Sequence, residues 1–153
     1  MMLSFLALLG SLWITPPCEA AFCKCAAPAD VPAAVAASDA VFTGRVLSVR
    51  DTTIAVGEHA WPVRRVTLRA DRAWKGVESR LVVVLTGMGG GDCGFAFRRG
   101  ESYLVYAHEN GGVLRAGMCG RTAAVSQARA DVHELGQPAH RWRRWSRGGR
   151  VEE

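Results

Sequence analysis

Cysteine is the residue type in this chain with the widest chemistry, because a thiol can form a disulfide, bind a metal or act as a nucleophile. The five cysteines are Cys18, Cys23, Cys25, Cys93 and Cys119. Cys18 lies at the end of an apolar leader that we expect to be removed, which leaves an even set of four. An even set in an exported chain predicts two disulfides.

The spacing of the cysteines limits how they can pair. Cys23 and Cys25 stand two residues apart, and a bond between them would require a strained ring. We therefore expect both to reach the distant cysteines, in either of the two pairings that remain. Each bridge would then close a loop of roughly 70–95 residues and contribute roughly 4–5 kcal/mol as an upper value. Thiolates at this spacing can also hold copper or zinc, but distant partners favour disulfides, and we predict no metal site.

No other residues form a recognisable catalytic or cofactor-binding set. Ligand spacing is absent among the four histidines, which are His59, His108, His133 and His140. The run Gly89–Asp92 is not followed by Gly-Lys-Ser/Thr, so we interpret it as a turn that positions Cys93 and not as a phosphate loop. Phe42 and Trp74 are predicted to be core residues. The sequence therefore predicts a binding protein without a cofactor and not an enzyme.

Residues 1–20 have the pattern of a signal peptide. Met2 to Thr15 is almost wholly apolar, Pro16 and Pro17 interrupt it, and Glu19-Ala20-Ala21 offers small residues for cleavage. The apolar run is shorter than the roughly 20 residues of a membrane span. We therefore expect export to a secreted, periplasmic or extracellular location, with cleavage leaving Ala21-Phe22 or Phe22 before Cys23.

Residues 21–138 are predicted to form one mostly β domain. Strands are expected at 41–49, 61–72, 81–85, 103–107 and 113–115. In the predicted strand 61–72, Val66, Leu68 and Ala70 alternate with polar residues, as a strand with one buried face requires. Gly44 predicts a bulge or bend, and residues 51–58 predict a turn or short hairpin. Asn110-Gly111-Gly112 is a strong hairpin turn.

Two helical segments are expected beside these strands. Residues 32–38 can form one or two turns, with Pro32 at a tolerated first-turn position. A longer helix is predicted over residues 123–135, with Thr122 as its N-cap and Gly136 and Pro138 after its end. Its apolar face consists of Ala124, Ala128, Val132 and Leu135. Five or six short strands with a C-terminal helix predict a small closed barrel.

Residues 139–153 are predicted to be a disordered basic tail. They contribute +3 of the chain's formal net charge of +5, because they contain five arginines and two glutamates. Arginine with tryptophan is suited to an anionic membrane surface. The expected surface-binding residues are Arg141, Trp142, Arg143, Arg144, Trp145 and Arg147.

Six short segments, in order, carry a resemblance to a known superfamily. They are Cys23-Lys24-Cys25, Ser38 to Val46, Trp74-Lys75-Gly76, Cys93-Gly94-Phe95, Tyr103 to Ala107, and Cys119-Gly120-Arg121. This set, which covers about residues 23–136, resembles the tissue inhibitor of metalloproteinases (TIMP) and netrin-module superfamily. The resemblance implies a five-stranded barrel of the OB type and the bridges Cys23–Cys93 and Cys25–Cys119.

The resemblance also implies a mode of action. In the inhibitors of this superfamily, the first mature residue is a cysteine whose free α-amine and carbonyl oxygen chelate the zinc of a protease. Carried over, Cys23 would be the chelator and Lys24 the residue that enters the specificity pocket. A neutral amine can ligate zinc, whereas an amide nitrogen cannot. The predicted cleavage sites depart from the family here, because they would make the Cys23 nitrogen an amide.

Two functions from different classes remain. The first is an exported protein-binding module, whose partner would be a protein and, in the inhibitory form, a zinc metalloprotease bound at Cys23, Lys24 and Cys25. The second is a non-inhibitory envelope or surface protein that docks through the barrel and the basic tail. We predict a monomer and no nucleic-acid partner, because export and the absence of an aromatic-rich strand face argue against one.

Overall fold

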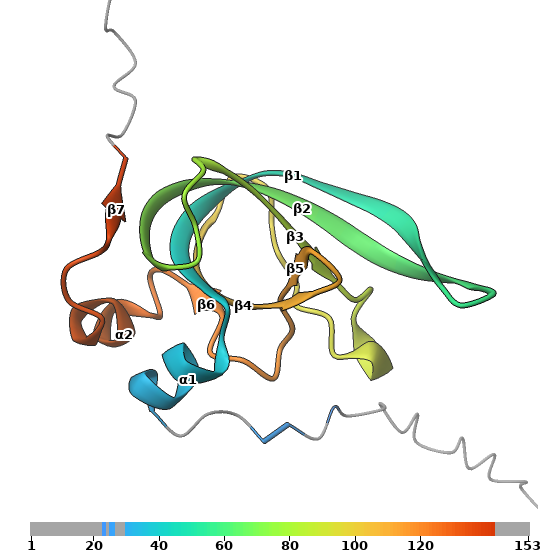
Figure 1. Cartoon of the computed structure of the whole chain (residues 1–153), viewed down its shortest axis with the longest axis horizontal. Helices are drawn as coiled ribbons and strands as arrows, with labels where there is room; N and C mark the ends of the chain where they lie inside the picture. Colours follow the sequence, from blue (N-terminus) through green and yellow to red (C-terminus); the bar gives the residue numbers. More distant parts are fainter. Residues whose placement is uncertain (1–22, 24, 27–29, 143–153) are drawn as a thin grey trace, which may run out of the picture.

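Five strands of this protein close into a ring (Figure 1). The structure is a computed structural model that describes residues 23, 25–26 and 30–142. The predicted signal peptide, Lys24 and the last four tail residues named above lie outside the described residues. The ring strands are β1 (Ala40–Val56), β2 (His59–Lys75), β3 (Leu81–Thr86), β4 (Ser102–Asn110) and β5 (Val113–Arg115).

The order around the ring is β1, β2, β3, β5, β4 and back to β1. Every neighbouring pair is antiparallel except β3 and β5, which run parallel. Five shorter elements lie around it: α1 (Val31–Ala37), the 3-10 turn η1 (Gly90–Asp92), β6 (Ala123–Ala124), α2 (Arg129–Glu134) and β7 (His140–Arg141). The prediction of a mostly β fold is therefore confirmed. Among the described residues, no helix is long and apolar enough to cross a bilayer.

The main core fills the inside of the ring. Val66, Leu68 and Ala70 are fully buried there, so the alternation predicted for β2 is confirmed. Phe42 from β1 and Tyr103 and Val105 from β4 belong to the same cluster. Because the strands alternate between inside and outside, this packing leaves a second set of side chains on the outer face of the ring.

The first hairpin is longer than the sequence predicted. Residues 51–58 were expected in a turn or short hairpin, and they form the end of a long hairpin, in which residues 51–56 continue β1 and only Gly57 and Glu58 form the turn. Thr52, Thr53 and Ile54 are β-branched residues, which favour extended backbone, and Gly57 supplies the positive φ of 61°. Figure 1 shows the end of this hairpin reaching well beyond the ring.

Gly44 lies at a bulge, as predicted. The register of β1 against β2 shifts between Thr43 and Gly44. A Cβ at Gly44 would stand 3.1 Å from the carbonyl oxygen of Arg69. The strands can therefore approach closely at this bend only because residue 44 has no side chain.

The predicted helix over residues 123–135 is wrong in its first half. Ala123 and Ala124 form β6, which pairs with Leu104 and Tyr103 of β4. Thr122 is not an N-cap, because its buried hydroxyl accepts from the Tyr106 N–H at 3.0 Å and donates to the Tyr106 carbonyl at 3.2 Å. Strand pairing therefore overrides helix propensity here, and α2 begins only at Arg129.

The two helices cover one part of the outer face of the ring. Ala34 of α1 and Ala128 beside α2 pack with Val41, Leu104 and Tyr106 in a second apolar cluster. In α1, the Asp30 carboxylate accepts from the Ala33 N–H at 2.8 Å, and Pro32 lies in the first turn as predicted. The Trp74 indole belongs to the rim of this cluster and donates to the Gly136 carbonyl at 3.0 Å.

The first described residues of the predicted tail are part of the folded domain. His140 and Arg141 form β7, which pairs with Ala73 and Arg72 of β2. The Trp142 N–H donates to the Asp71 carbonyl at 3.0 Å, and its ring packs against the main core. Arg141 and Trp142 therefore belong to the folded domain, which corrects the expectation that they form part of a disordered surface-binding tail.

An ion pair fixes α2 to the loop that carries Cys119. The Arg121 guanidinium donates to both carboxylate oxygens of Asp131, at 2.9 and 2.7 Å, and the Tyr106 hydroxyl lies 3.4 Å from the same carboxylate. Hydrogen bonds from Arg121 lower the pKa of Asp131 against the opposing effect of burial. Burial, followed by the charge of Asp131, raises the pKa of Tyr106 to about 12, so this phenol stays neutral.

Asp131 is expected to make the protein less stable in acid. Because its folded pKa lies below the unfolded value of about 3.9, its contribution is complete above that value and is lost as the pH falls through the folded pKa. Asp131→Asn should therefore lower the free energy of unfolding by about 2 kcal/mol at neutral pH. It should also flatten the dependence of stability on pH below about 4.

Urea unfolding measured at several pH values would check this expectation. Asp51→Asn is the matched control, because the Asp51–Arg64 pair is exposed and 3.3 Å long, and such pairs contribute about 0–1 kcal/mol. Equal losses in the two variants at neutral pH would contradict the assigned role of Asp131.

Candidate functional site: the disulfide-clamped edge

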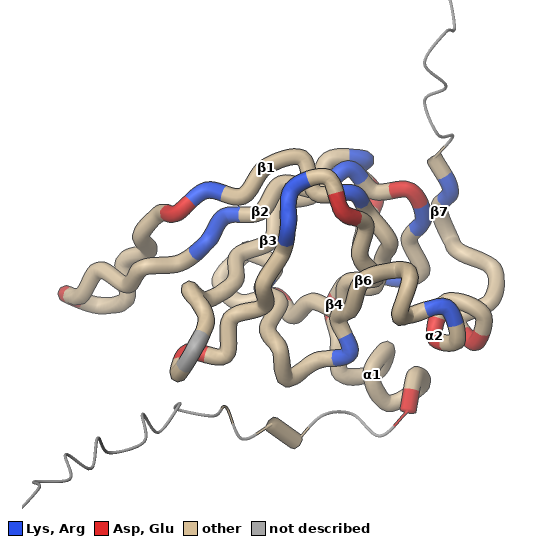
Figure 2. Tube along the Cα trace, turned by 180° about the vertical axis from the view of Figure 1, so that it is seen from behind, with Lys and Arg blue, Asp and Glu red and all other residues tan. Residues whose placement is uncertain are grey.

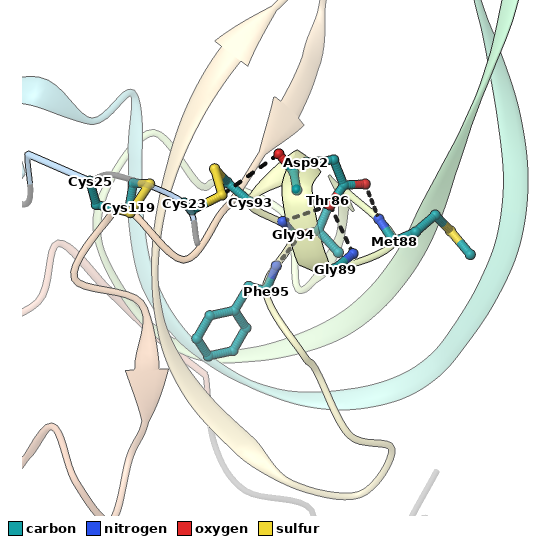
Figure 3. Close-up of a disulfide and its surroundings, with 11 residues drawn as sticks. Cys23, Cys25, Thr86, Met88, Gly89, Asp92, Cys93, Gly94, Phe95 and Cys119 are labelled. Atoms are coloured by element: carbon teal, nitrogen blue, oxygen red, sulfur yellow. Dashed lines mark hydrogen bonds between the residues drawn. A yellow bond between two sulfur atoms is a disulfide. The ribbon is translucent and has the colours of Figure 1, made fainter. Parts of the chain in front are cut away.

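Two disulfides join the N-terminal segment to two loops at one edge of the ring (Figure 3). Cys23 pairs with Cys93, with 5.5 Å between their Cα atoms, and Cys25 pairs with Cys119, with 4.9 Å between theirs. The residues alone left two pairings open, and this is the one that the resemblance implies. Two disulfides are typical of a protein that folds in an oxidising compartment.

The loop that carries Cys93 is organised around the carboxylate of Asp92. It accepts hydrogen bonds from the N–H groups of Met88, Gly89 and Gly94, at 2.5, 2.9 and 3.1 Å. Figure 3 shows these three nitrogens converging on it. Partial burial acts to raise the pKa of Asp92, but the hydrogen bonds from Met88, Gly94 and Gly89 outweigh it and lower the pKa. The side chain therefore occupies the N–H groups that a bound anion would otherwise use.

The two cysteine-bearing loops also contact each other directly. Gly94 and Gly117 form a β-bridge, and the Met118 N–H donates to the Cys93 carbonyl at 2.9 Å. A Cβ at Gly94 would overlap the carbonyl oxygen of Gly87. Because this contact lies between the two disulfides, both bridges attach the N-terminal segment to one connected support.

Several described residues of this edge are accessible to a partner. Cys25 and Ala26 are exposed, Cys23 is half-buried, and Met118 keeps 50% of its surface accessible. A cavity of about 370 Å³ lies beside Cys119, with Ala26, Ala34, Tyr106, His108 and Arg121 among its lining residues. An exposed methionine beside a cavity is suited to contact with another apolar surface, because its side chain is flexible and polarisable.

The described part of this edge has no metal-binding or nucleophilic group. Its four cysteines are oxidised, so no thiolate is available as a ligand. Among the described residues, no three histidine, cysteine, aspartate or glutamate side chains are close enough to share a metal ion.

The structure separates the two groups of predicted site residues. Cys23 and Cys25 lie together at the edge, whereas Arg141 and Trp142 lie on and beside β7. Figures 1 and 2 both place β7 on the opposite side of the ring from the η1 turn next to Cys93. Sequence reasoning missed the role of Asp92, although an aspartate at the end of a glycine-rich loop is a recognisable signal for such turn hydrogen bonding. No family model and no curated protein matches this sequence.

Proposed function

We propose that this protein is an exported protein-binding module of the TIMP and netrin type, and that its binding surface is the edge formed by Cys23, Lys24 and Cys25. The single observation that carries the proposal is the pair of disulfides that attach this segment to two loops in contact with each other. In this proposal the ring is an OB-type barrel, and the protein acts by binding and not by catalysis.

The fold supports this proposal through its strand order. The order β1, β2, β3, β5, β4 with closure between β4 and β1, and with one parallel pair, is the order that an OB-type barrel would require, and it supports the proposal in this sense. The disulfides support export, because such bonds persist in secreted and periplasmic proteins.

The clamped edge is suited to binding because disulfides already hold two of its residues, Cys23 and Cys25. A free N-terminal segment loses conformational entropy when a partner fixes it, and that loss weakens binding. Here the two bridges have restricted Cys23 and Cys25 before any partner arrives. Exposed Met118 and the adjacent cavity extend the surface beside them.

The inhibitory form of the proposal has one chemical requirement. Chelation of a protease zinc needs a free α-amine on Cys23, and this requires cleavage after Phe22. Cleavage after Ala20 or Ala21 would convert that nitrogen to an amide and exclude chelation. In that case the edge would bind its partner through Lys24 and the neighbouring side chains without contacting a zinc ion.

One experiment tests both levels of the proposal. The processed, oxidised protein would be sequenced from its N-terminus and assayed against purified zinc metalloproteases. The inhibitory form predicts a start at Cys23 and an inhibition that is lost when one alanine is added before Cys23. A start at Ala21 or Phe22, or inhibition that survives the added alanine, would contradict chelation.

The edge itself is tested by placing a negative charge on it, in the same assays and in partner pull-downs. Binding should be lost with Lys24→Glu or Met118→Asp and retained with Arg50→Glu, an exposed position on the β1–β2 hairpin. If a partner binds all three variants equally, then the edge is not the binding surface.

The alternative function, docking to an anionic surface through the tail, has less support. It was expected to use Arg141 and Trp142, but these residues pair with β2 and pack against the core. It would therefore depend on Arg143, Arg144, Trp145 and Arg147, which lie outside the described residues.

A further inference from the structure

A second cavity lies far from the disulfide edge, on the outer face of the sheet formed by β1, β2 and β4. It measures about 630 Å³, within the range of small-molecule sites. Its lining includes Thr43, Asp71, Arg72, Ser102, Arg141 and Trp142. These residues come from four strands and from the residue after β7, so the assembled fold is needed to bring them together.

The floor of this cavity contains a buried hydroxyl with an unmet hydrogen bond. Thr43 is only 2% exposed, and its Oγ1 has no partner among the described residues. An unsatisfied buried polar group costs about 1–3 kcal/mol. Because this oxygen is itself closed off from solvent, it cannot contact a ligand in the cavity, and the site rests on the groups around it.

Two arginines face each other across the rim. Arg72 of β2 is the direct strand neighbour of both Thr43 and Arg141, and like charges placed opposite each other destabilise a sheet. Among the described residues, neither arginine has a carboxylate within ion-pair distance. The Arg72 guanidinium instead lies over the Trp74 ring, 5.5 Å from its centroid. Figure 2 shows basic segments gathered where β2 and β7 run side by side.

Facing arginines alone do not identify a site. The pairs Arg45–Arg69 and Arg50–Arg65 also stand opposite each other on β1 and β2. What distinguishes the Arg72–Arg141 pair is the cavity beside it, which Asp71, Ser102 and Trp142 also line. Arg45, which is also the neighbour of Ser102 on β4, adds positive potential to the same face.

A β-bulge determines which side chains face the cavity. Thr43 pairs with Arg72 and Gly44 pairs with Ala70, so Asp71 is the extra residue in β2. In a regular strand, Asp71 and Arg72 would point to opposite faces, whereas here both line the same cavity. Bulges commonly redirect side chains next to functional sites.

The charges and the ring of Trp142 indicate the class of ligand. Two arginines and one aspartate give the lining a net charge of +1, which fits a monoanion, and a guanidinium binds a carboxylate with two hydrogen bonds. Asp71 would repel a second negative charge but can accept hydrogen bonds from hydroxyl groups, as can Ser102. Trp142, which is half-buried and stacked on His140 at 5.8 Å, offers an apolar face to a ring.

We propose that this cavity binds a sugar acid, with its carboxylate at Arg72 and Arg141, its hydroxyl groups at Asp71 and Ser102, and its ring against Trp142. The same chemistry is found in a free hexuronic acid and in a uronic acid unit of a polysaccharide. The site shares no residue with the disulfide edge, so a test of this site does not depend on whether the proposed function is correct.

Titration of the oxidised full chain with glucuronate, followed by NMR or calorimetry, tests the site. We expect saturable binding of glucuronate and none of glucose, which has the ring without the charge. A uronic acid oligosaccharide that binds much more tightly than the monosaccharide would identify a polysaccharide unit as the ligand, and equal affinities would identify the free acid.

Three variants separate the site from a general charge effect. Arg141→Gln and Arg72→Gln should each weaken glucuronate binding by about tenfold or more, while Arg50→Gln, from a facing pair outside the cavity, should leave it unchanged. Neither Arg141→Gln nor Arg72→Gln should lower the melting temperature, because each removes one of two like charges on neighbouring strands. Absence of glucuronate binding, equal binding of glucose, or equal weakening by Arg50→Gln would overturn the proposal.

Discussion

Replacement of Cys23 and Cys93 together by serine is expected to lower the free energy of unfolding by about 3.5 kcal/mol, and replacement of Cys25 and Cys119 is expected to lower it by about the same amount. Replacement of all four should cost about 8 kcal/mol, which is comparable to the whole stability of a small domain. The second bridge to be removed should therefore cost more than the first, whichever is removed first.

This order of costs follows from how the two bridges share their loops. Alone, Cys23–Cys93 spans 70 residues and Cys25–Cys119 spans 94. When one bridge is present, the other closes only the two residues from Cys23 to Cys25 and the 26 residues from Cys93 to Cys119. Closing a shorter loop removes less conformational entropy from the unfolded chain. The second bridge therefore adds less to the free energy of unfolding than it would add alone.

Urea unfolding of the four proteins measures this cycle. Because each variant removes both partners of a bridge, no free thiol is created in the domain. Equal costs for the first and second removals would show that the two bridges act independently. That result would contradict the shared-loop description.

Gly76→Ala is expected to destabilise the protein by about 4 kcal/mol or more, whereas Gly57→Ala should cost about 1 kcal/mol. Both glycines have a φ of 61°, so the strain of an alanine in left-handed backbone lowers the free energy of unfolding by the same amount in both variants. Nothing lies within 4 Å of a Cβ at Gly57, but a Cβ at Gly76 would overlap the Asp39 carbonyl oxygen.

Asp39 cannot move aside to relieve this overlap. Its N–H donates to the Ala107 carbonyl at 2.9 Å, and its carboxylate accepts from the Glu109 N–H at 2.7 Å. These bonds lie where β1 meets β4 and the ring closes. Thermal and urea unfolding of the two variants give the comparison. If Gly76→Ala is recovered only in an unfolded form while Gly57→Ala folds, the expectation is met, and equal losses would refute it.

The strand content of the fold could be predicted where one local pattern dominates. The alternation of Val66, Leu68 and Ala70 fixed the buried face of β2, and Asn110-Gly111-Gly112 fixed the turn before β5, where both glycines have a positive φ. The prediction was wrong where a distant partner decided the outcome. Ala123 and Ala124 favour a helix, yet they pair with β4, and His140 and Arg141 look like a solvated tail, yet they pair with β2.

The candidate site could be predicted only in its composition. Counting cysteines predicted two disulfides, but the residues gave no basis for choosing between the two long-range pairings, because that choice depends on which loops meet. The bridge between Gly94 and Gly117 is the contact between the loops that carry Cys93 and Cys119. The cavity beside Trp142 was missed for the same reason, because the Asp71 bulge and the β7 pairing that build it are properties of the assembled sheet.

The interleaved bridges also determine how the protein must mature. Synthesis runs from the N-terminus, so Cys93 becomes available to both Cys23 and Cys25 before Cys119 has been made. A first bond between Cys25 and Cys93 is therefore accessible and non-native. It is corrected by thiol–disulfide exchange, in which the Cys23 thiolate attacks Cys93 and releases the Cys25 thiolate. Efficient production of this protein should accordingly depend on a disulfide isomerase and not on an oxidant alone.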